Sequence, residues 1–239
     1  MKLSTKQFYG IKLGERPFDW HHFIGSVRAG KSMSGLLAFL IWAIKFNRSR
    51  HGQDYIIMAK NKLQLRGFIA TELKDFSNLL GLRFRHDQRN SKIIIGLNTF
   101  HLCDASDARA FERFQGITVY GIYYDELPNL AREVVLEGFR RVSPDVGAKY
   151  VSTGNPDHPY HWVKLEFIDK CDDTNAEVIH FYPGDNPSDK PKIGEGYYQR
   201  QWNMHSEYER KRIFECMIVT INWLVHTLIH HLLVPKKHC

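Results

Sequence analysis

The feature that most constrains the fold is a single GxxxxGK[ST] pattern, GSVRAGKS, at residues 25–32. Glycines let backbone N–H groups curve around a phosphate, and the positive N-terminal end of a following helix attracts the anion. In this pattern the lysine reaches the β- and γ-phosphates and the last hydroxyl binds Mg²⁺. A short apolar strand before the loop and an apolar helix after it argue against an ordinary glycine turn. The sequence therefore predicts a nucleotide-binding loop formed by Gly25, Ser26, Val27, Arg28, Ala29, Gly30, Lys31 and Ser32.

Within this loop, Arg28 occupies a position that the general pattern leaves free. One interpretation is a solvated loop side chain. The other is a guanidinium near the γ-phosphate, which would offset charge in the transition state as an arginine finger does. Position in the sequence alone leaves both interpretations open.

A second candidate site follows an apolar run, VYGIYY at residues 119–124, which ends in Asp125 and Glu126. In P-loop ATPases the first acidic residue after such a strand holds Mg²⁺ through water. The next one faces the other side and polarises the attacking water as a general base. A surface pair that caps the next helix is the alternative, but the nucleotide-binding loop earlier in the chain favours the catalytic interpretation.

A third feature is the segment VSTGNP at residues 151–156, where another predicted strand ends in a turn. The carboxyl ends of parallel strands converge on the ligand crevice of a sheet. Ser152, Thr153 and Asn155 are therefore candidates for sensing the γ-phosphate. Gly-Asn-Pro also ends strands in any protein, so the functional interpretation depends on the other two motifs.

Strands and helices alternate along the chain. Short β-branched and aromatic runs predict strands at residues 23–24, 54–59, 92–96, 99–103, 118–124, 148–153 and 178–182. Apolar runs and apolar faces predict helices at residues 31–48, 61–80 and 133–142. The alternation predicts an α/β fold with a largely parallel central sheet flanked by helices. Strands 92–96 and 99–103 are a candidate hairpin, and residues 1–22 show no clear period.

The end of the chain differs from the rest in composition. We expect a globular domain over residues 1–183, and a linker and helical segment over residues 184–215, which contain several prolines and glycines. Residues 216–239 contain no Asp or Glu and are largely apolar. A membrane span is one interpretation of this tail, but Asn222, His226, His230 and His231 would be costly in hydrocarbon. We favour a tail produced by truncation or a reading-frame change, and no membrane contact.

Composition adds weaker constraints. A net charge of +7 over 239 residues allows a nucleic-acid partner without requiring one. Four isolated cysteines and a start without an apolar signal segment indicate a reduced, cytoplasmic protein. The histidines lack companions at metal-ligand spacing, so no metal is expected besides Mg²⁺ bound with the nucleotide. Either a DNA-facing patch or a solvated face is formed by Lys45, Arg48, Arg50, Lys60, Lys62 and Arg66.

Together these motifs resemble the large terminase subunit, the DNA-packaging ATPase of tailed double-stranded DNA bacteriophages. Four stretches carry the resemblance. They are LSTKQ at residues 3–7, the arginine-bearing loop 25–32, residues 113–126 leading into the acidic pair, and STGNP at 152–156 with the aromatic segment PYHW at 159–162. The resemblance spans about residues 3–215.

The resemblance implies an additional-strand P-loop ATPase that assembles as a homo-oligomeric ring on a capsid and drives double-stranded DNA into it. Gln7 would recognise adenine, Lys31 and Ser32 would bind phosphate and Mg²⁺, and Asp125 would hold the metal. Glu126 would activate water with the assistance of Arg28, while Ser152 and Thr153 would couple nucleotide state to DNA movement. The implied cofactors are ATP and Mg²⁺. The implied partners are DNA, the portal protein and the small terminase subunit, in the cytoplasm of the host cell.

One departure from the family pattern concerns the nuclease domain that large terminases carry after the ATPase. Two-metal phosphodiester cleavage needs several carboxylate ligands, and residues 216–239 provide none. We therefore expect no nuclease activity from this chain. The alternatives are a helicase-like nucleic-acid-dependent ATPase, a small-molecule kinase, or an inactive nucleotide-binding remnant. The absence of a second set of helicase motifs favours the packaging ATPase.

Overall fold

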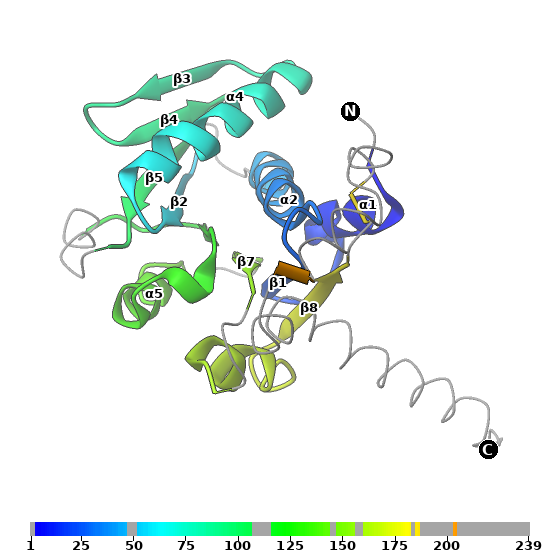
Figure 1. Ribbon diagram of the computed structural model, residues 1–239. Coiled ribbons are helices and arrows are strands. Elements are labelled where there is room, and N and C mark those ends of the chain that lie inside the picture. The colour runs from blue at the N-terminus through cyan, green and yellow to red at the C-terminus, as the bar shows by residue number, and fades with distance from the viewer. Residues whose placement is uncertain are drawn as a thin grey trace, which may run out of the picture.

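A computed structural model describes residues 3–46, 52–106, 116–143, 147–155, 160–182, 185–186 and 203–204. In this part of the chain one sheet has the strand order β3-β4-β5-β2-β6-β7-β1-β8, with helices on both faces (Figure 1). The strands are β1 (Trp20–Gly25), β2 (Asp54–Ala59), β3 (Phe84–Asp87), β4 (Lys92–Ile95), β5 (Asn98–Asp104), β6 (Gly121–Tyr124), β7 (Lys149–Gly154) and β8 (Ala176–Phe181). The helices are α1 (Thr5–Ile11), α2 (Lys31–Phe46), α3 (Lys62–Gln64), α4 (Ala70–Leu79) and α5 (Arg132–Phe139). Shorter turns are η1 (Leu13–Glu15), η2 (Leu65–Ile69), η4 (Leu127–Asn129) and η5 (Lys164–Ile168).

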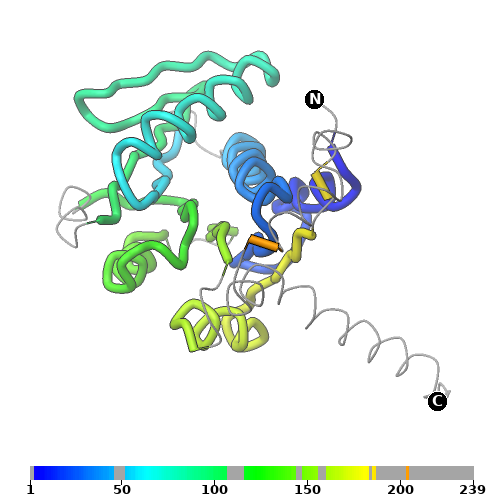
Figure 2. The backbone as a smooth tube through the Cα atoms, in the orientation of Figure 1, coloured from blue at the N-terminus to red at the C-terminus, as the bar shows by residue number. Residues whose placement is uncertain are grey.

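The sheet confirms the predicted α/β class and its largely parallel character. Strands β5, β2, β6, β7, β1 and β8 pair in parallel, and β3, β4 and β5 pair antiparallel. Strand β7 lies between β1, which precedes the phosphate loop, and β6, which precedes the acidic pair. This inserted strand defines the additional-strand class, so that expectation is also confirmed. Strands β7, β1 and β8, which are far apart in sequence, lie side by side in this order at one end of the sheet, and Figure 2 shows them close together.

Strand β1 is longer than the two residues that its sequence predicted. All six of its residues are buried, including His21 and His22. A strand inside a parallel sheet is covered on both faces and shows no alternation of apolar and polar residues. The two histidines therefore weaken the apolar signal of this strand in the sequence, although the whole strand is buried.

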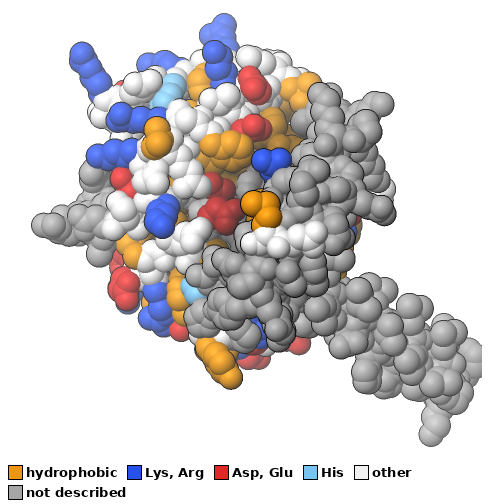
Figure 3. Space-filling model, viewed as in Figure 1, with side chains coloured by type: hydrophobic (Ala, Val, Ile, Leu, Met, Phe, Trp, Pro, Cys, Tyr) orange, Lys and Arg blue, Asp and Glu red, His pale blue; other side chains and the backbone are white. Residues whose placement is uncertain are grey.

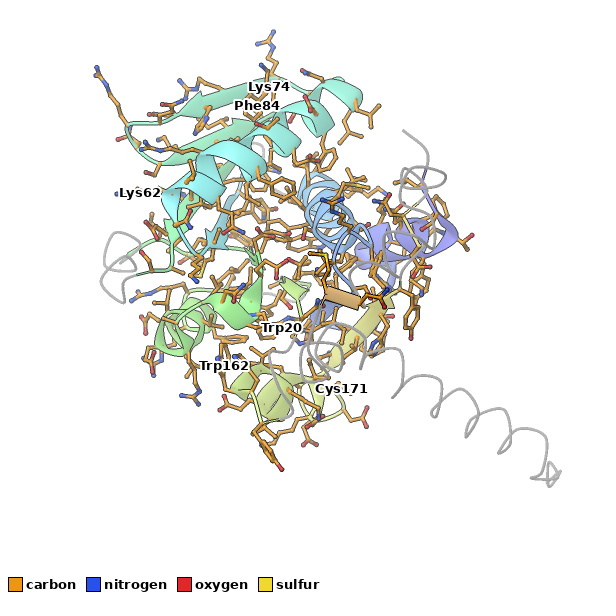
Figure 4. The ribbon with its side chains drawn as sticks, viewed as in Figure 1. Trp20, Lys62, Lys74, Phe84, Trp162 and Cys171 are labelled. Carbon is orange, nitrogen blue, oxygen red and sulfur yellow. The ribbon has the colours of Figure 1, made fainter. Side chains whose placement is uncertain are left out.

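Two apolar layers enclose the sheet. On one face α2 and α4 pack over residues such as Phe23, Tyr55 and Tyr123. On the other face α5 and η5 pack around Trp20, whose ring contacts those of Tyr124, Tyr150, Phe139 and Phe167. Figure 4 shows Trp20 in the interior of this layer. The predicted flanking helices are thus confirmed on both faces.

The helix predicted over residues 61–80 forms as one continuous helical segment, and its predicted apolar face is confirmed at Ile69, Leu73 and Phe76, which are buried. The face differs before these residues, where Leu63 is 82% exposed and Phe68 is 43% exposed while Leu65 is buried. The reason is η2, a π-helical turn between α3 and α4. A π turn holds an additional residue, so it rotates the residues before it relative to those after it.

Other boundaries shift by a few residues, and two elements were missed. The helix predicted at 31–48 begins at Lys31 and is described as far as Phe46, after which the described residues resume at 52. The helix predicted at 133–142 spans Arg132–Phe139, and the strand predicted from residue 118 begins at Gly121. Strand β3 has only half-buried or exposed residues and gives no apolar signal. Helix α1 is short and begins with a capping box at Ser4.

The predictions for residues 184–215 and 216–239 lie almost wholly outside the described residues and stay predictions. Among the residues that the structure describes, no helix is long and apolar enough to cross a membrane.

Candidate nucleotide site

The loop between β1 and α2 is anchored to the two strands beside β1. The N–H of Ser26 donates to the carbonyl of Phe181 at 3.0 Å, and the N–H of Gly25 donates to Oδ1 of Asn155 at 2.8 Å. Gly25 has φ +145°, and a Cβ at this position would lie 1.9 Å from the carbonyl oxygen of Phe181. Only glycine fits here. Asn155, predicted as a sensing residue, therefore holds the start of the loop.

The other end of the loop contacts helix α1. Gly30 has φ +86°, and a Cβ there would lie 2.6 Å from Nε2 of Gln7. Gln7 is fully buried, and its Oε1 accepts the N–H of Ser4 at 2.9 Å. The Nε2 group has no hydrogen-bond partner among the described residues. The structure thus brings Gln7 to the predicted nucleotide-binding loop, with an amide donor that has no partner among the described residues.

Arg28 adopts a left-handed backbone conformation with φ +63° at the exposed tip of the loop. Its carbonyl accepts the side-chain amide of Asn186 at 3.2 Å. Val27 beside it is also exposed, whereas Ala29 is buried. Arg28 therefore lies at the rim of the site.

Lys31 and the acidic pair face each other. Lys31 is the first residue of α2 and only 7% exposed. Its Nζ lies 3.7 Å from Oε1 of Glu126. Glu126 follows β6 in a left-handed conformation with φ +50°, which turns the chain sharply after Asp125. The predicted loop lysine and the predicted catalytic pair thus form one site, and Figure 3 shows acidic side chains at the middle of the visible face.

Asp125 is 2% exposed and accepts hydrogen bonds on both carboxylate oxygens. Oδ1 accepts the hydroxyls of Tyr123 and Thr153, each at 3.1 Å, and Oδ2 accepts the side-chain amide of Gln64 at 2.5 Å. Burial raises the pKa of Asp125, and the neighbouring charge of Glu126 raises the pKa further, while the three hydrogen bonds oppose the shift. A charged carboxylate in this position is costly without a cation.

Thr153 connects the strand β7 to the acidic pair. Its hydroxyl donates to Oδ1 of Asp125 and accepts the backbone N–H of Glu126 at 3.2 Å. Ser152, the adjacent residue, points to the opposite face of the sheet, where its hydroxyl lies 2.6 Å from Nδ1 of His22. Of the predicted sensing residues, Thr153 and Asn155 touch the site and Ser152 does not.

Two residues of the site were missed by sequence reasoning. Tyr123 lies two positions before Asp125 on β6, and a period of two places both side chains on one face; this signal was present in the sequence. Gln64 belongs to α3 and reaches Asp125 across a separation of 61 residues. No local pattern indicates that contact.

The family model described as terminase large subunit, T4likevirus-type, N-terminal, matches residues 22–220. The chain belongs to the large terminase subunit family. A search of curated proteins finds no match. The family assignment agrees with the loop, the acidic pair and the inserted strand β7.

Solved structures of phage terminases have the same fold. The large terminase of a thermophilic bacteriophage superposes with a TM-score of 0.77 at 25% sequence identity, over 89% of this chain and 52% of that one. This chain therefore spans about half the length of that thermophilic-phage terminase. The ATPase domain of the Thermus phage P74-26 large terminase gives a TM-score of 0.61 at 12% identity, over 90% of this chain and 93% of that domain. The DNA packaging ATPase N-terminal domain of bacteriophage phi29 gives 0.51 at 12% identity, over 74% and 95%. These comparisons establish a terminase ATPase fold.

Proposed function

We propose that this chain hydrolyses ATP with Mg²⁺ and uses the energy to move double-stranded DNA into a preformed viral capsid. The observation that carries the proposal is the buried Asp125, placed beside Glu126 opposite Lys31 and tied by Thr153 to the neighbouring strand. The thermophilic-phage large terminase has been solved in complex with ADP, at 26% identity to this chain, and with ATP-gamma-S, at 25% identity. Nucleotide binding by the same loop of this chain is consistent with both.

The residues around Asp125 fit a magnesium ion bound with the nucleotide. Burial raises the pKa of Asp125, and a nearby divalent cation would stabilise the charged carboxylate. Ser32, at the start of α2, would supply the hydroxyl ligand. Lys31 would hold the phosphates together with the loop N–H groups other than those of Gly25, Ser26 and Ala29, which donate to protein acceptors. Mg²⁺ would neutralise charge on the phosphates when bound.

Glu126 is the proposed general base. Its carboxylate pairs with Lys31 at 3.7 Å, so a phosphate that attracts Lys31 would release the carboxylate to polarise water. Arg28, at the exposed tip of the loop, would assist by offsetting charge on the γ-phosphate. Ion pairing of Lys31 with Glu126 would therefore keep the base from acting before nucleotide binds.

Gln7 is the proposed adenine-recognising residue. Its Nε2 group is buried against Gly30 with no hydrogen-bond partner among the described residues. A buried amide donor without a partner is destabilising, and an adenine ring nitrogen would accept its hydrogen bond. The same group that makes the apoprotein less stable would thus select the base.

Thr153 and Asn155 are the proposed coupling residues. Thr153 contacts both acidic residues, and Asn155 holds Gly25 at the start of the loop. Both lie at the end of β7, so a displacement of the acidic pair is transmitted to that strand and to the loop. A coupling role for Ser152 rests on the family resemblance alone.

The proposed partners are double-stranded DNA, the portal protein, the small terminase subunit and further copies of this chain in a ring, all in the host cytoplasm. These follow from the family to which the chain belongs. Because the chain spans about half of the thermophilic-phage terminase, the nuclease activity of whole large terminases is not assigned to it.

Substitution of the proposed base tests the function. Glu126→Gln keeps the size and hydrogen-bonding capacity of the side chain, so we expect ATP affinity to be retained and turnover to fall by about 10²–10⁴-fold. Mg²⁺-dependent phosphate release and fluorescent nucleotide binding measure the two quantities. Glu133→Gln, an exposed position on α5, is the matched control and should leave both unchanged.

Unchanged turnover in Glu126→Gln would refute the assignment of the base. Nucleotide binding without hydrolysis by the unmodified chain would instead identify an inactive remnant.

A further inference from the structure

A small pocket lies between the first turns of the helical segment α3–η2 and the strands β3, β4 and β5, away from the phosphate loop. Its polar lining consists of Lys62, Arg66, His86, Gln88, Ser91 and Asp104. Leu65 and Leu102 provide the apolar remainder. Lysine, arginine and hydroxyl groups donate hydrogen bonds that phosphate oxygens accept. A pocket lined by such groups is therefore suited to a phosphate.

Lys62 and Arg66 are four residues apart, and both side chains are exposed. Neither forms an ion pair or a side-chain hydrogen bond with any described residue. Asp104 is the only acidic residue of the lining, and its Oδ1 accepts the backbone N–H and the hydroxyl of Ser106 at 3.1 and 2.7 Å. Like charges at this helical spacing repel each other, and an anion held between them removes that repulsion.

His86 adds a further unsatisfied group to the lining. Its Nε2 atom is buried and has no hydrogen-bond partner in the described part of the chain. Burial lowers the pKa of His86, and the charge of Arg66 lowers it further because the two side chains are close neighbours. In the tautomer that carries the proton on Nε2, neutral His86 adds one hydrogen-bond donor to those of Lys62 and Arg66.

Basic residues also surround the pocket. Arg85, Arg89 and Lys92 belong to the adjacent β3–β4 hairpin, and Arg85 and Arg89 are exposed. The nearby Asp87 is engaged by the backbone and the side chain of Asn90. Figure 3 shows Lys and Arg side chains gathered over the region where Figure 1 places α4, β3 and β4. An extended basic surface around a pocket suits a polyanion better than a single small anion.

We propose that this pocket binds a backbone phosphate of double-stranded DNA, with Lys62 and Arg66 as the ligands. The choice of DNA rests on the proposed function; the anionic character of the ligand rests on the pocket alone. The exposed Arg85 and Arg89 of the hairpin offer contacts to further phosphates, and contacts to phosphates carry no sequence preference, as packaging of a whole genome requires.

The pocket is directly connected to the nucleotide site through one turn of helix. Gln64 lies between Lys62 and Arg66 in the chain, and its amide donates to Oδ2 of Asp125 at 2.5 Å. The π turn η2 begins at the next residue, and such turns are frequent at functional sites. A phosphate held by Lys62 and Arg66 would therefore act on the same helical turn that positions Asp125. Gln64 is in this proposal a positioning residue. The proposal predicts that DNA stimulates ATP turnover.

The test measures binding of a fluorescein-labelled DNA duplex at several NaCl concentrations. The slope of log affinity against log salt should fall by about 1 in Lys62→Ala or Arg66→Ala and by about 2 in the double variant. Lys170→Ala is the matched control. It removes the same charge from an exposed position after η5, and Figure 4 shows the adjacent Cys171 far from Lys62 and from the basic surface. The control should keep the unmodified slope.

A second readout separates binding from folding. Basal ATP turnover and the thermal unfolding midpoint of the double variant should match those of the unmodified chain, while the stimulation of turnover by DNA is lost. A double variant with unmodified affinity and slope would overturn the proposal, as would an unmodified chain that does not bind the duplex.

The outcomes for this proposal and for the proposed function are distinguishable. Loss of DNA binding in the double variant of a chain that hydrolyses no ATP would support the phosphate pocket and refute the proposed function. ATP turnover that depends on Glu126, together with DNA binding that is indifferent to Lys62 and Arg66, would refute the pocket alone.

Discussion

At the scale of single residues, the hydroxyl of Thr153 is the group that contacts both acidic residues of the site. It donates to Asp125 and accepts from the backbone N–H of Glu126, so it orients the proposed metal ligand and the proposed base at once. Asp125 has two other donors, Tyr123 and Gln64. The N–H of Glu126 donates to Thr153 and depends on that hydroxyl for its position.

We predict that Thr153→Val lowers ATP turnover by about 10–100-fold, because small displacements of catalytic groups carry large kinetic costs. Valine has nearly the same shape as threonine and removes only the hydroxyl. Nucleotide affinity should change little, since Lys31 and the loop are untouched. Steady-state phosphate release and nucleotide titration measure the two effects.

Thr99→Val is the control for this substitution, because Thr99 is half-buried on β5 and its side chain forms no hydrogen bond with a described residue. An equal loss of turnover in both variants would contradict a specific role for the Thr153 hydroxyl.

At the scale of elements, the loop between β1 and α2 depends on its contact with β8. Gly25 permits the backbone of the loop to approach the carbonyl of Phe181, and Ser26 donates to that carbonyl. The start of the loop is therefore held by two strands, β7 and β8, whose positions the loop sequence does not determine.

We predict that Gly25→Ala lowers the free energy of unfolding by about 2–4 kcal/mol, because the added methyl group meets backbone that cannot move aside and because φ is positive. Urea unfolding measures the effect. Gly67→Ala is the matched control: no atom lies within 4 Å of the added Cβ, and alanine favours a helix, so stability should rise by up to about 1 kcal/mol. A Gly25→Ala variant as stable as the unmodified chain would show that the loop can move away from β8 without loss of stability.

At the scale of the whole molecule, the paired strands β1 and β8 at one end of the sheet contain buried and half-buried histidines. Burial lowers the pKa of His21 on β1 and of His180 on β8, and it lowers the pKa of His22 to about 3. In the unfolded chain these groups titrate near their ordinary pKa of about 6.5. Between these values the unfolded chain binds protons that the folded chain does not.

We predict that the free energy of unfolding falls as the pH drops below about 6.5, with His22 alone contributing about 1.4 kcal/mol per pH unit down to a pH of about 3. Glu177, whose pKa is lowered, acts in the same direction, and Asp125, whose pKa is raised, acts in the opposite one. Urea unfolding across this range measures the sum.

His22→Asn isolates the contribution of one histidine. Asparagine retains a polar atom near Ser152 but does not titrate, so this variant should be less stable at pH 7 and show a shallower loss in acid. Identical slopes in the two proteins would mean that His22 is not the titrating group.

The sequence by itself determined the contiguous parts of this protein. The alternation of strands and helices, the glycine-rich turn between β1 and α2 and the acidic pair after β6 depend on neighbouring residues, and the structure places each where the sequence predicted it. The roles of the turn and the pair in phosphate binding and catalysis stay predictions. Gln7 was proposed from the family resemblance and Asn155 from its place after a predicted strand, and the structure brings both to the loop.

Only the tertiary structure decided which distant residues meet. Strand order and register place the side chain of Thr153 beside Asp125 and that of Ser152 on the other face of the sheet, and the π turn η2 leaves Leu63 exposed while Leu65 is buried. The same long-range packing brings Gln64 to Asp125. Such contacts depend on how separate elements pack. The packing free energy is a sum over the whole core, so no local sequence pattern predicts these contacts.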